Sequence, residues 1–355
     1  MISSTSSGKL FIAGEYAVVE AGYPAILVAV NQFIKVSLEP CQYRGSIKAF
    51  NNAPIAFDRE EERIVLDYRD NNLAYVIKAI QVVENLALSL NKKLSFYNLT
   101  IDSELENDDG KKFGLGSSAA VTVSAIKVLC ELYELDFNDL EIFKLAAIVH
   151  YYLKSNGSGG DIAASVFHGW IAYHSYDRNW LAKEAQSKTT LQLLHMEWPH
   201  LHIERLQAPR DLTLMVGWTQ SPASTTKLVD NMQKNRLKHQ ATYTQFLAES
   251  KDCVHQLIQA FKDNDSENIF KLIAKNRELL LHMSKDLNIT IETSKLKELC
   301  DIANTYEGAA KSSGAGGGDC GIALMHNDND FKQLISAWNQ ADIEHLNIEV
   351  YTGEA

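Results

Sequence analysis

The residues that could do chemistry are concentrated in four short segments, three of which are rich in glycine. The strongest signal is Gly114-Leu-Gly-Ser-Ser-Ala-Ala120, which directly precedes a stretch with apolar residues at helical spacing. Glycines let a backbone curve closely around an anion, and the free amide groups and dipole at a helix start attract it. The hydroxyls of Ser117 and Ser118 could also bind phosphate oxygens or Mg²⁺. The segment therefore predicts a phosphate-binding loop, with a simple helix cap as the alternative.

A second glycine cluster, Lys311-Ser-Ser-Gly-Ala-Gly-Gly-Gly-Asp319, lies near the other end of the chain. Glycine loses more backbone entropy on folding than any other residue, so such a run indicates that its conformation is needed. A flexible linker would have polar, disordered flanks. Here the flanks are a predicted helix at 294–306 and a predicted strand at 321–325, so we expect an ordered functional loop.

One lysine and one aspartate stand out in the other two segments. Lys9 opens an otherwise apolar strand in Gly8-Lys-Leu-Phe-Ile-Ala-Gly-Glu-Tyr16, and Asp161 follows the glycine turn of Asn156-Gly-Ser-Gly-Gly-Asp161. Lys9 could be an exposed strand end, and Asp161 could be an ordinary helix cap. Their chemical alternative is a cation and an acid that act together on a charged substrate.

The composition limits the partners of the protein. The chain has 355 residues, which suggests two domains, and a formal net charge of −11, which gives no basic field for nucleic acid or an anionic membrane. Anionic ligands must therefore be attracted by local groups. The five cysteines are widely spaced and form no CxxC pair, which indicates reduced thiols and a cytoplasmic location. The early apolar run at 25–30 is far shorter than the roughly 20 residues that span a bilayer, so we expect no membrane segment.

The elements that must position these residues alternate without a repeating βα unit, which favours an α+β fold. We expect strands at 9–13, 25–38, 96–101, 169–176, 202–206, 212–218, 321–325 and 347–351. We expect helices at 73–90, from 117 onward, and at 139–153, 179–197, 224–235, 242–264, 266–285, 294–306 and 329–340. Trp198-Pro199 predicts the seam between an N-terminal domain (1–198) and a C-terminal domain (199–355). The charged run 59–63 is interpreted as a solvated turn.

Together the four segments resemble the GHMP kinase superfamily, which comprises galactokinases, homoserine kinases, mevalonate kinases and phosphomevalonate kinases. The order and wording are most similar to bacterial-type phosphomevalonate kinases, through Gly8 to Tyr16, Lys111-Lys-Phe-Gly-Leu-Gly-Ser-Ser118, Gly217-Trp-Thr219 and Lys311 to Gly321. One departure is that many members have a proline several residues before the phosphate loop, where this chain has Asp108-Asp-Gly-Lys-Lys112. This difference indicates the subfamily and leaves the fold prediction intact.

The resemblance implies an N-terminal domain like the second domain of ribosomal protein S5, a C-terminal ferredoxin-like domain, and an active site between them that uses ATP and Mg²⁺. By motif position, Lys9 and Asp161 become the catalytic pair. The implied ATP- and phosphate-binding residues are Lys112, Gly114, Leu115, Gly116, Ser117, Ser118 and Ala119, with Ser118 also a candidate magnesium ligand and Lys111 a second choice for the extra cation. The implied substrate-binding residues are Tyr16, Ser158, Ser224, Thr225, Gly314, Ala315 and Gly316.

The acceptor implied by the resemblance is phosphomevalonate, which would make the partners two small molecules and the protein a monomer or homodimer. Mevalonate kinase or another GHMP kinase, a diphosphomevalonate decarboxylase, and a non-catalytic sensor on the same scaffold remain alternatives. The family analogy also implies an adenine pocket around Asn72 and Tyr75. His195, His200 and His202 lack regular ligand spacing, so we expect no zinc site there.

Overall fold

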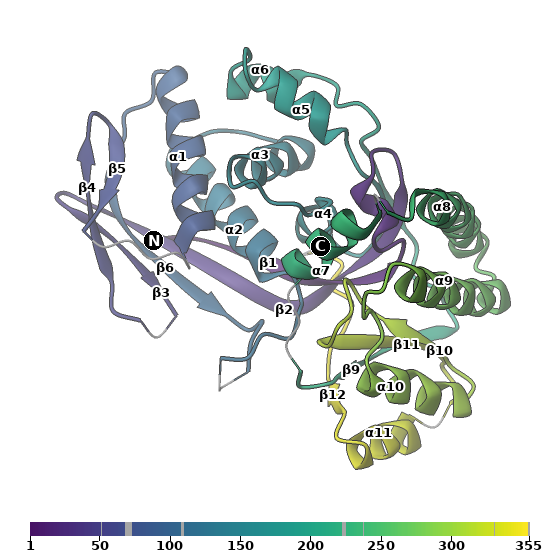
Figure 1. The fold of residues 1–355 in the computed structure, drawn as a ribbon. Coiled ribbons are helices and arrows are strands. Elements are labelled where there is room, and N and C mark those ends of the chain that lie inside the picture. The colour runs from purple at the N-terminus through teal and green to yellow at the C-terminus, as the bar shows by residue number, and fades with distance from the viewer. Residues whose placement is uncertain are drawn as a thin grey trace.

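The chain folds around two β-sheets of unequal size, each covered by helices (Figure 1). The computed structural model describes residues 1–50, 52–67, 73–107, 110–221, 225–236, 238–329 and 331–353, and the side chains of 225–227 are outside this description. The larger sheet contains β1 (Ile2–Ala13), β2 (Pro24–Cys41), β3 (Gly45–Ala49), β4 (Ile55–Glu60), β5 (Arg63–Leu66), β6 (Phe96–Ser103), β7 (Trp170–His174) and β8 (His202–Leu206). Its order is β5-β4-β3-β6-β2-β7-β8, with β1 paired to β2.

The centre of the larger sheet is the long strand β2, which pairs with three neighbours. β1 runs antiparallel along it, while β6 and β7 pair with its two halves on the other edge. The register shifts between Ser7 and Gly8, which marks a β-bulge. Beyond the bulge Lys9 pairs with Ala29, so the strand that carries Lys9 is fixed within the sheet.

Helices cover the larger sheet (Figure 1). They are α1 (Ala74–Ser89), α2 (Ser117–Leu132), α3 (Asp139–Tyr152), α4 (Gly160–Phe167), α5 (Arg178–Glu184) and α6 (Thr190–His195), with a 3-10 turn η1 (Ala17–Val19) after β1. The apolar faces of α2 and α4 pack against β1 and β2. A capping box between Asn138 and Glu141 starts α3.

The smaller sheet consists of four antiparallel strands in the order β10-β11-β9-β12. The strands are β9 (Leu212–Trp218), β10 (Ala309–Ser312), β11 (Cys320–His326) and β12 (Glu344–Leu346), and the helices of this half are α7 (Thr225–Arg236), α8 (Gln240–Asp263), α9 (Ser266–Asp286), α10 (Ser294–Thr305) and α11 (Phe331–Gln340). α10 and α11 cover one face around the buried Trp338, which forms a second core. Residues of the other face, such as Ile322, join the main core.

The α+β prediction is confirmed, and the strand order of the smaller sheet is that of the expected ferredoxin-like domain. The domain boundary at 198/199 stays a prediction. It falls before β8, which pairs with β7 in the larger sheet. Within the described part of the chain, no helix is both long and apolar enough to cross a bilayer.

Three details of the predicted elements are wrong. The expected helix at 179–197 is two short helices, α5 and α6. The expected strand at 347–351 is not a strand, because the chain changes sheets there: β12 pairs with β9, whereas Val350 bridges Val30 in the larger sheet. The charged run 59–63 is a turn only at 61–62, since Arg59 lies in β4 and pairs with the buried Glu84.

Candidate active site

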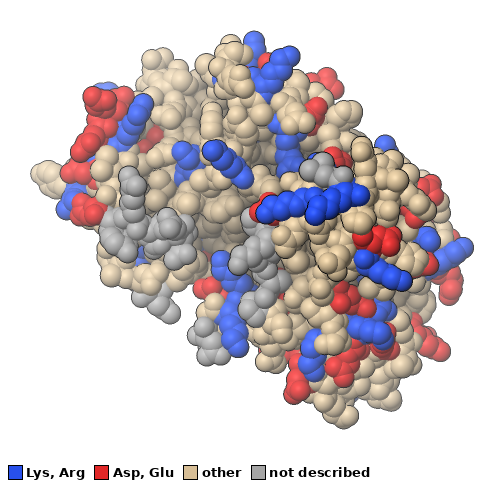
Figure 2. Space-filling view, viewed as in Figure 1, with Lys and Arg blue, Asp and Glu red and all other residues tan. Residues whose placement is uncertain are grey.

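A cavity of about 560 Å³ lies where the two halves of the molecule meet, and all four sequence segments contribute to its wall. Figure 2 shows this face hollowed at its centre, with Lys and Arg side chains around the hollow. Three lysines and three carboxylates line it: Lys9, Lys111, Lys112, Glu15, Asp161 and Asp319. Cations and oxygen donors of this kind fit a ligand that carries phosphate groups and a metal ion.

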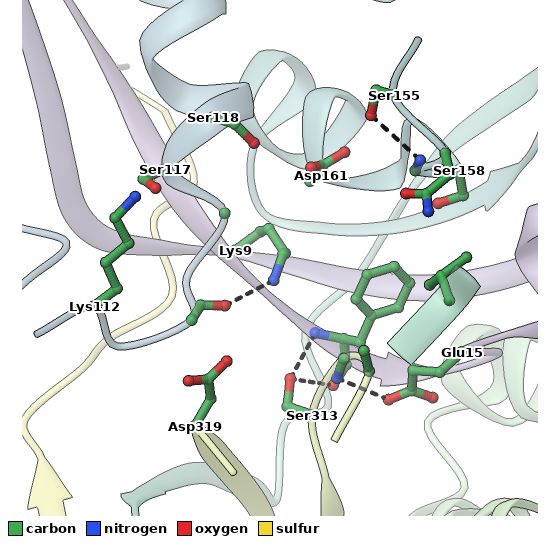
Figure 3. A pocket seen from close by; sticks show the side chains of 18 of the residues that line it. Lys9, Glu15, Lys112, Ser117, Ser118, Ser155, Ser158, Asp161, Ser313 and Asp319 are labelled. Atoms are coloured by element: carbon green, nitrogen blue, oxygen red, sulfur yellow. Dashed lines mark hydrogen bonds between the residues drawn. The ribbon is translucent and has the colours of Figure 1, made fainter. Parts of the chain in front are cut away.

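Lys9 is the buried cation of the cavity. Its side chain is only 7% exposed, and its Nζ donates to the carbonyl oxygen of Gly114 at 3.1 Å. Figure 3 shows it between Asp161 and Asp319. Burial lowers the pKa of Lys9, and the negative charges of Asp161 and Asp319 partly oppose this effect. Lys9 is therefore not a solvated residue at an exposed strand end, since its charged group faces the cavity.

The phosphate-loop prediction agrees with the geometry at the start of α2. Gly114 and Gly116 have φ values of +81° and +84°, a region that favours glycine. No side chain caps the helix, and among the described residues no acceptor takes the amide hydrogens of Ser117 and Ser118. These amides and the helix dipole can therefore bind an anion in the cavity.

The second glycine segment, residues 312–318, reaches the cavity from the smaller sheet and is fastened to the end of β1. The Ser313 hydroxyl accepts from the Phe11 amide at 2.9 Å and donates to the Phe11 carbonyl at 3.0 Å. The Tyr16 hydroxyl donates to the Ala315 carbonyl at 2.5 Å. Burial raises the pKa of Tyr16, so this phenol stays protonated and remains a donor. The loop is ordered, as its predicted flanks required.

The two glycine loops also meet each other directly. A β-carbon on Gly114 would lie 2.6 Å from Oδ2 of Asp319, so Gly114 is required for this close approach. Next to it, the Cys320 thiol donates to the Phe113 carbonyl at 3.1 Å. The Asp319 carbonyl in turn accepts from the Thr219 amide at 2.9 Å. Segments more than a hundred residues apart thus form one wall of the cavity.

Asp161 lies in the first turn of α4, opposite the α2 loop. The helix cap is Gly159, with φ of +85°, so Asp161 is not the simple cap that was one reading of the sequence. The preceding loop is held by Arg178, which donates to the carbonyls of Asn156 at 2.9 Å and Gly157 at 3.2 Å. Its other nitrogen donates to the Val19 carbonyl at 2.9 Å. The acid is therefore carried on a braced turn.

Tyr75 and His150 form the cavity wall beside Ser118 and Asp161. Their rings lie 4.8 Å apart, and the buried His150 contacts the Thr122 hydroxyl at 3.4 Å. Burial lowers the pKa of His150, so its imidazole is neutral at pH 7, although Asp161 partly opposes the shift. Burial also raises the pKa of Tyr75. The predicted adenine pocket around Tyr75 stays a prediction, and Asn72 is outside the described residues.

Most of the predicted site residues line this cavity. They are Lys9, Tyr16, Lys112, Gly114, Gly116, Ser117, Ser118, Ser158, Asp161, Gly314 and Ala315. The side chains of Leu115 and Ala119 lie in the core, which leaves only their main chain for a ligand. Gly316 packs against the Ile291 carbonyl. Ser224 is outside the described residues, and Thr225 begins α7 without a described side chain.

Sequence reasoning assigned no role to several residues that the cavity contains. Glu15, His150, Ser155, Ser313 and Asp319 line it, and Lys311 lies directly behind it. A signal existed for three of them. Glu15 follows the glycine that ends the predicted strand, and Lys311 and Asp319 are the charged residues that flank the second glycine run. His150 carried no such signal, because it lies within an apolar helical pattern.

Comparison with known proteins agrees with this geometry. The family model for the GHMP kinases N terminal domain matches residues 74–169, and that for the GHMP kinases C terminal matches residues 257–344. A phosphomevalonate kinase of Streptomyces sp. (strain CL190) is 37% identical over 95% of this chain and 93% of its own. A mevalonate kinase of Methanocaldococcus jannaschii is 26% identical over 98% of both chains. The solved structure of Streptococcus pneumoniae phosphomevalonate kinase in complex with phosphomevalonate and AMPPNP has a TM-score of 0.87 and 29% identity, covering 99% of this chain and 100% of that one.

Proposed function

The chain belongs to the GHMP kinase family, and on this basis we propose that it acts as a phosphomevalonate kinase. Such an enzyme transfers the γ-phosphoryl group of ATP to the phosphate of (R)-5-phosphomevalonate and releases 5-diphosphomevalonate and ADP. The observation that carries kinase chemistry is the convergence of a buried lysine, an uncapped helix start and two glycine loops in one cavity. The greater identity to a phosphomevalonate kinase than to a mevalonate kinase supports the acceptor.

Lys9 is proposed to neutralise charge on the transferring phosphoryl group. Phosphoryl transfer depends mainly on positioning and electrostatic stabilisation, and a buried cation is effective because little water screens it. The carbonyl of Gly114 holds the ammonium group in place at 3.1 Å. Through this contact, the residue that would stabilise the transferring group is tied to the loop that would bind the triphosphate.

Asp161 is proposed to orient Lys9 and to contribute a metal ligand. Burial lowers the pKa of Lys9, and Asp161 makes the largest of the electrostatic contributions that oppose this shift, so it favours the charged ammonium group. A general base is less necessary here than for an alcohol acceptor, because a phosphate monoester has a second pKa of about 6 and is mostly deprotonated at neutral pH. The acceptor oxygen already carries the negative charge needed for attack.

The oxygen donors of the cavity fit a magnesium ion. Mg²⁺ is usually bound through one or two carboxylates together with substrate phosphates and water. Asp161 and Ser118 could supply the protein ligands, and no group of three or more His, Cys, Asp or Glu that could hold a metal occurs among the described residues. When bound with ATP, the ion would neutralise charge on the phosphate oxygens.

Lys112 is proposed to help bring two phosphate groups together. It is exposed at the edge of the cavity, and Figure 3 shows its side chain beside Ser117. Two anions that approach each other require additional cations, and the mobile ammonium group of an exposed lysine can follow either one. Ser158, Gly314, Ala315 and Tyr16 are proposed to contact the acceptor from the opposite walls.

A side-by-side assay tests the function. ADP release is measured with Mg-ATP and either phosphomevalonate or mevalonate, and the phosphorylated product is identified by mass spectrometry. We expect turnover with phosphomevalonate and little with mevalonate. The reverse preference would make the protein a mevalonate kinase, carbon dioxide release from diphosphomevalonate would indicate a decarboxylase, and ATP binding without turnover would indicate a sensor.

We also propose that the protein is cytoplasmic, which its five free cysteines support, and that it is a monomer or homodimer.

A further inference from the structure

A buried ion pair in the wall of the cavity joins the two halves of the molecule. Nζ of Lys311, in β10 of the smaller sheet, donates to Oε1 of Glu15, which follows β1 of the larger sheet. The side chains of Lys311 and Glu15 are 0% and 2% exposed. Lys311 also donates to the Ser312 carbonyl at 2.7 Å. Both charged groups are buried, so each depends on the other for its compensation.

The same carboxylate holds the second glycine loop. Oε1 of Glu15 accepts from the Gly314 amide at 3.3 Å, whereas Oε2 is buried with no hydrogen-bond partner among the described residues. A buried carboxylate oxygen without a partner is costly, so native proteins keep few of them. This carboxylate lies in the wall of the cavity, next to the loop whose amide it accepts from, so its position can serve the loop.

The loop needs such attachment because its glycines have much conformational freedom to lose when they are ordered. Gly314, Gly316, Gly317 and Gly318 all have φ between +71° and +149°. These residues lose much conformational entropy when they are ordered. Ser313, Gly314 and Ala315 nevertheless line the same cavity as Lys9.

Charge distinguishes the Glu15 attachment from the other two. The Ser313 and Tyr16 contacts join neutral groups, while the Glu15 contact joins an amide to an ionised group that is itself paired. Hydrogen bonds to ionised groups are the stronger kind. The two residues of the pair also belong to different halves of the molecule. The pair therefore fixes the loop relative to β1, which carries Lys9, as well as relative to β10.

We propose that Glu15 and Lys311 are positioning residues, which hold residues 312–318 over the cavity and thereby set the affinity for the acceptor. This inference rests on the proposed function for the identity of that acceptor. Neither residue needs to touch a substrate for this role. Loss of the pair should therefore raise the KM for phosphomevalonate more than it lowers kcat, because the catalytic lysine stays in place.

The test separates positioning from stability. Lys311→Met alone leaves the Glu15 charge buried and unpaired, so its unfolding midpoint should fall clearly. Replacing both charges, in Glu15→Leu with Lys311→Met, should return the midpoint close to that of the wild type, because buried pairs can be exchanged for apolar residues at little cost. We expect this double variant still to show a KM for phosphomevalonate raised by about tenfold, the equivalent of one lost hydrogen bond.

A matched control is the buried pair of Arg59 and Glu84, whose side chains are 11% and 3% exposed and lie away from the cavity. Arg59→Met should lower the unfolding midpoint without changing the KM. A double variant of Glu15 and Lys311 that folds like the wild type and keeps its KM would overturn the proposal. So would an Arg59→Met variant whose KM rises equally, since any destabilisation would then explain the effect.

A second measurement does not depend on the acceptor. Hydrogen–deuterium exchange of peptides that contain residues 313–318 should be faster in the double variant than in the wild type, while exchange in α2 stays the same. Unchanged exchange in the loop would refute the positioning role. If the wild type fails to phosphorylate phosphomevalonate but the exchange still changes, the assigned acceptor is wrong and the positioning role stands.

Discussion

The side chain of Lys9 fills the space next to the α-carbon of Gly116. A β-carbon on Gly116 would lie 3.1 Å from Cε and 3.2 Å from Cγ of the lysine, and 3.6 Å from Cβ of Asp161. The glycine therefore does more than permit a φ of +84° at the start of α2. Its missing side chain lets the proposed phosphate loop, the buried cation and the acid come together.

Gly116→Ala should damage catalysis as well as stability. The left-handed backbone costs roughly 1–2 kcal/mol for alanine, and the new methyl group displaces Lys9 by a few tenths of an ångström, which we expect to lower kcat/KM by about tenfold. Gly169→Ala is the matched control, because Gly169 has φ of +62° and, apart from its chain neighbours, no atom lies within 4 Å of an added β-carbon. Equal losses of kcat/KM in both variants would show that backbone strain alone is responsible.

The protonation state of Lys9 should limit activity at high pH. Burial lowers its pKa below the ordinary 10.5, so the free enzyme should lose its ammonium charge, and with it kcat/KM, at a pH below 10.5. Lys9→Arg should shift this high-pH loss of kcat/KM to a higher pH, because a guanidinium stays protonated above pH 12. Lys9→Met should lower kcat/KM by about 100- to 1,000-fold across the pH range. If Lys9→Arg lost kcat/KM at the same high pH as the wild type, the loss would be due to another group.

Asp161→Asn should shift the high-pH loss of kcat/KM to a lower pH. Asp161 is the main charge that raises the pKa of Lys9, so its neutralisation should let Lys9 deprotonate at a lower pH than in the wild type. We expect kcat at neutral pH to fall less than in Lys9→Met. If Asp161→Asn were far the more damaging and abolished the acid limb of the profile, Asp161 would be acting as a general base.

Lys112→Ala should weaken substrate binding with little effect on folding. Its side chain is exposed at the cavity edge, so its loss removes attraction for phosphate and little packing. We expect the KM for ATP or for phosphomevalonate to rise by about fivefold, and the effect should shrink at high salt, as expected for an exposed charge. Lys111→Ala is the comparison, since it should have the smaller effect. Unchanged KM values for both substrates would contradict the assignment.

A histidine outside the cavity should control acid stability. His174 lies beside His202 and His255, and burial, followed by repulsion from these rings and from Lys251, lowers its pKa to about 4, although Glu204 partly opposes the shift. Between pH 6.5 and about 4 the unfolded chain therefore binds a proton that the folded state does not, so stability should fall as the pH falls. In His174→Gln the urea midpoint should depend less on pH over this range. An unchanged dependence would contradict this origin.

Much of the site was predictable because its residues lie inside local patterns. The glycine spacing of Gly114 to Ser118, directly before a helix, predicts a phosphate loop. Lys9 is recognisable as the one charged residue in an apolar strand. No local pattern predicts which residues far apart in the chain contact each other. The pairing of Lys311 with Glu15 connects residues 296 positions apart, and the approach of Asp319 to Gly114 depends on how two sheets pack.

The fold was predictable where one element makes one kind of contact. The helices around Ile126 and Trp338 follow from apolar periodicity. β3, β4 and β5 carry polar and charged residues such as Arg59, whose burial becomes visible only when Glu84 of α1 lies against it. The segment 345–350 alternates polar and apolar residues, yet its two ends belong to different sheets, because periodicity does not reveal which sheet a strand joins.

The bridge between Val350 and Val30 has a mechanical consequence. The chain leaves the larger sheet after β8, builds the smaller sheet, and returns so that Tyr351 donates to the Ala29 carbonyl at 3.0 Å and accepts from the Gly169 amide at 2.7 Å. The chain therefore connects the smaller half to the larger sheet at two places, in addition to the side-chain contacts between the halves. A single cut of the chain between residues 207 and 211 should therefore leave the smaller half attached to the larger sheet through residues 350 and 351.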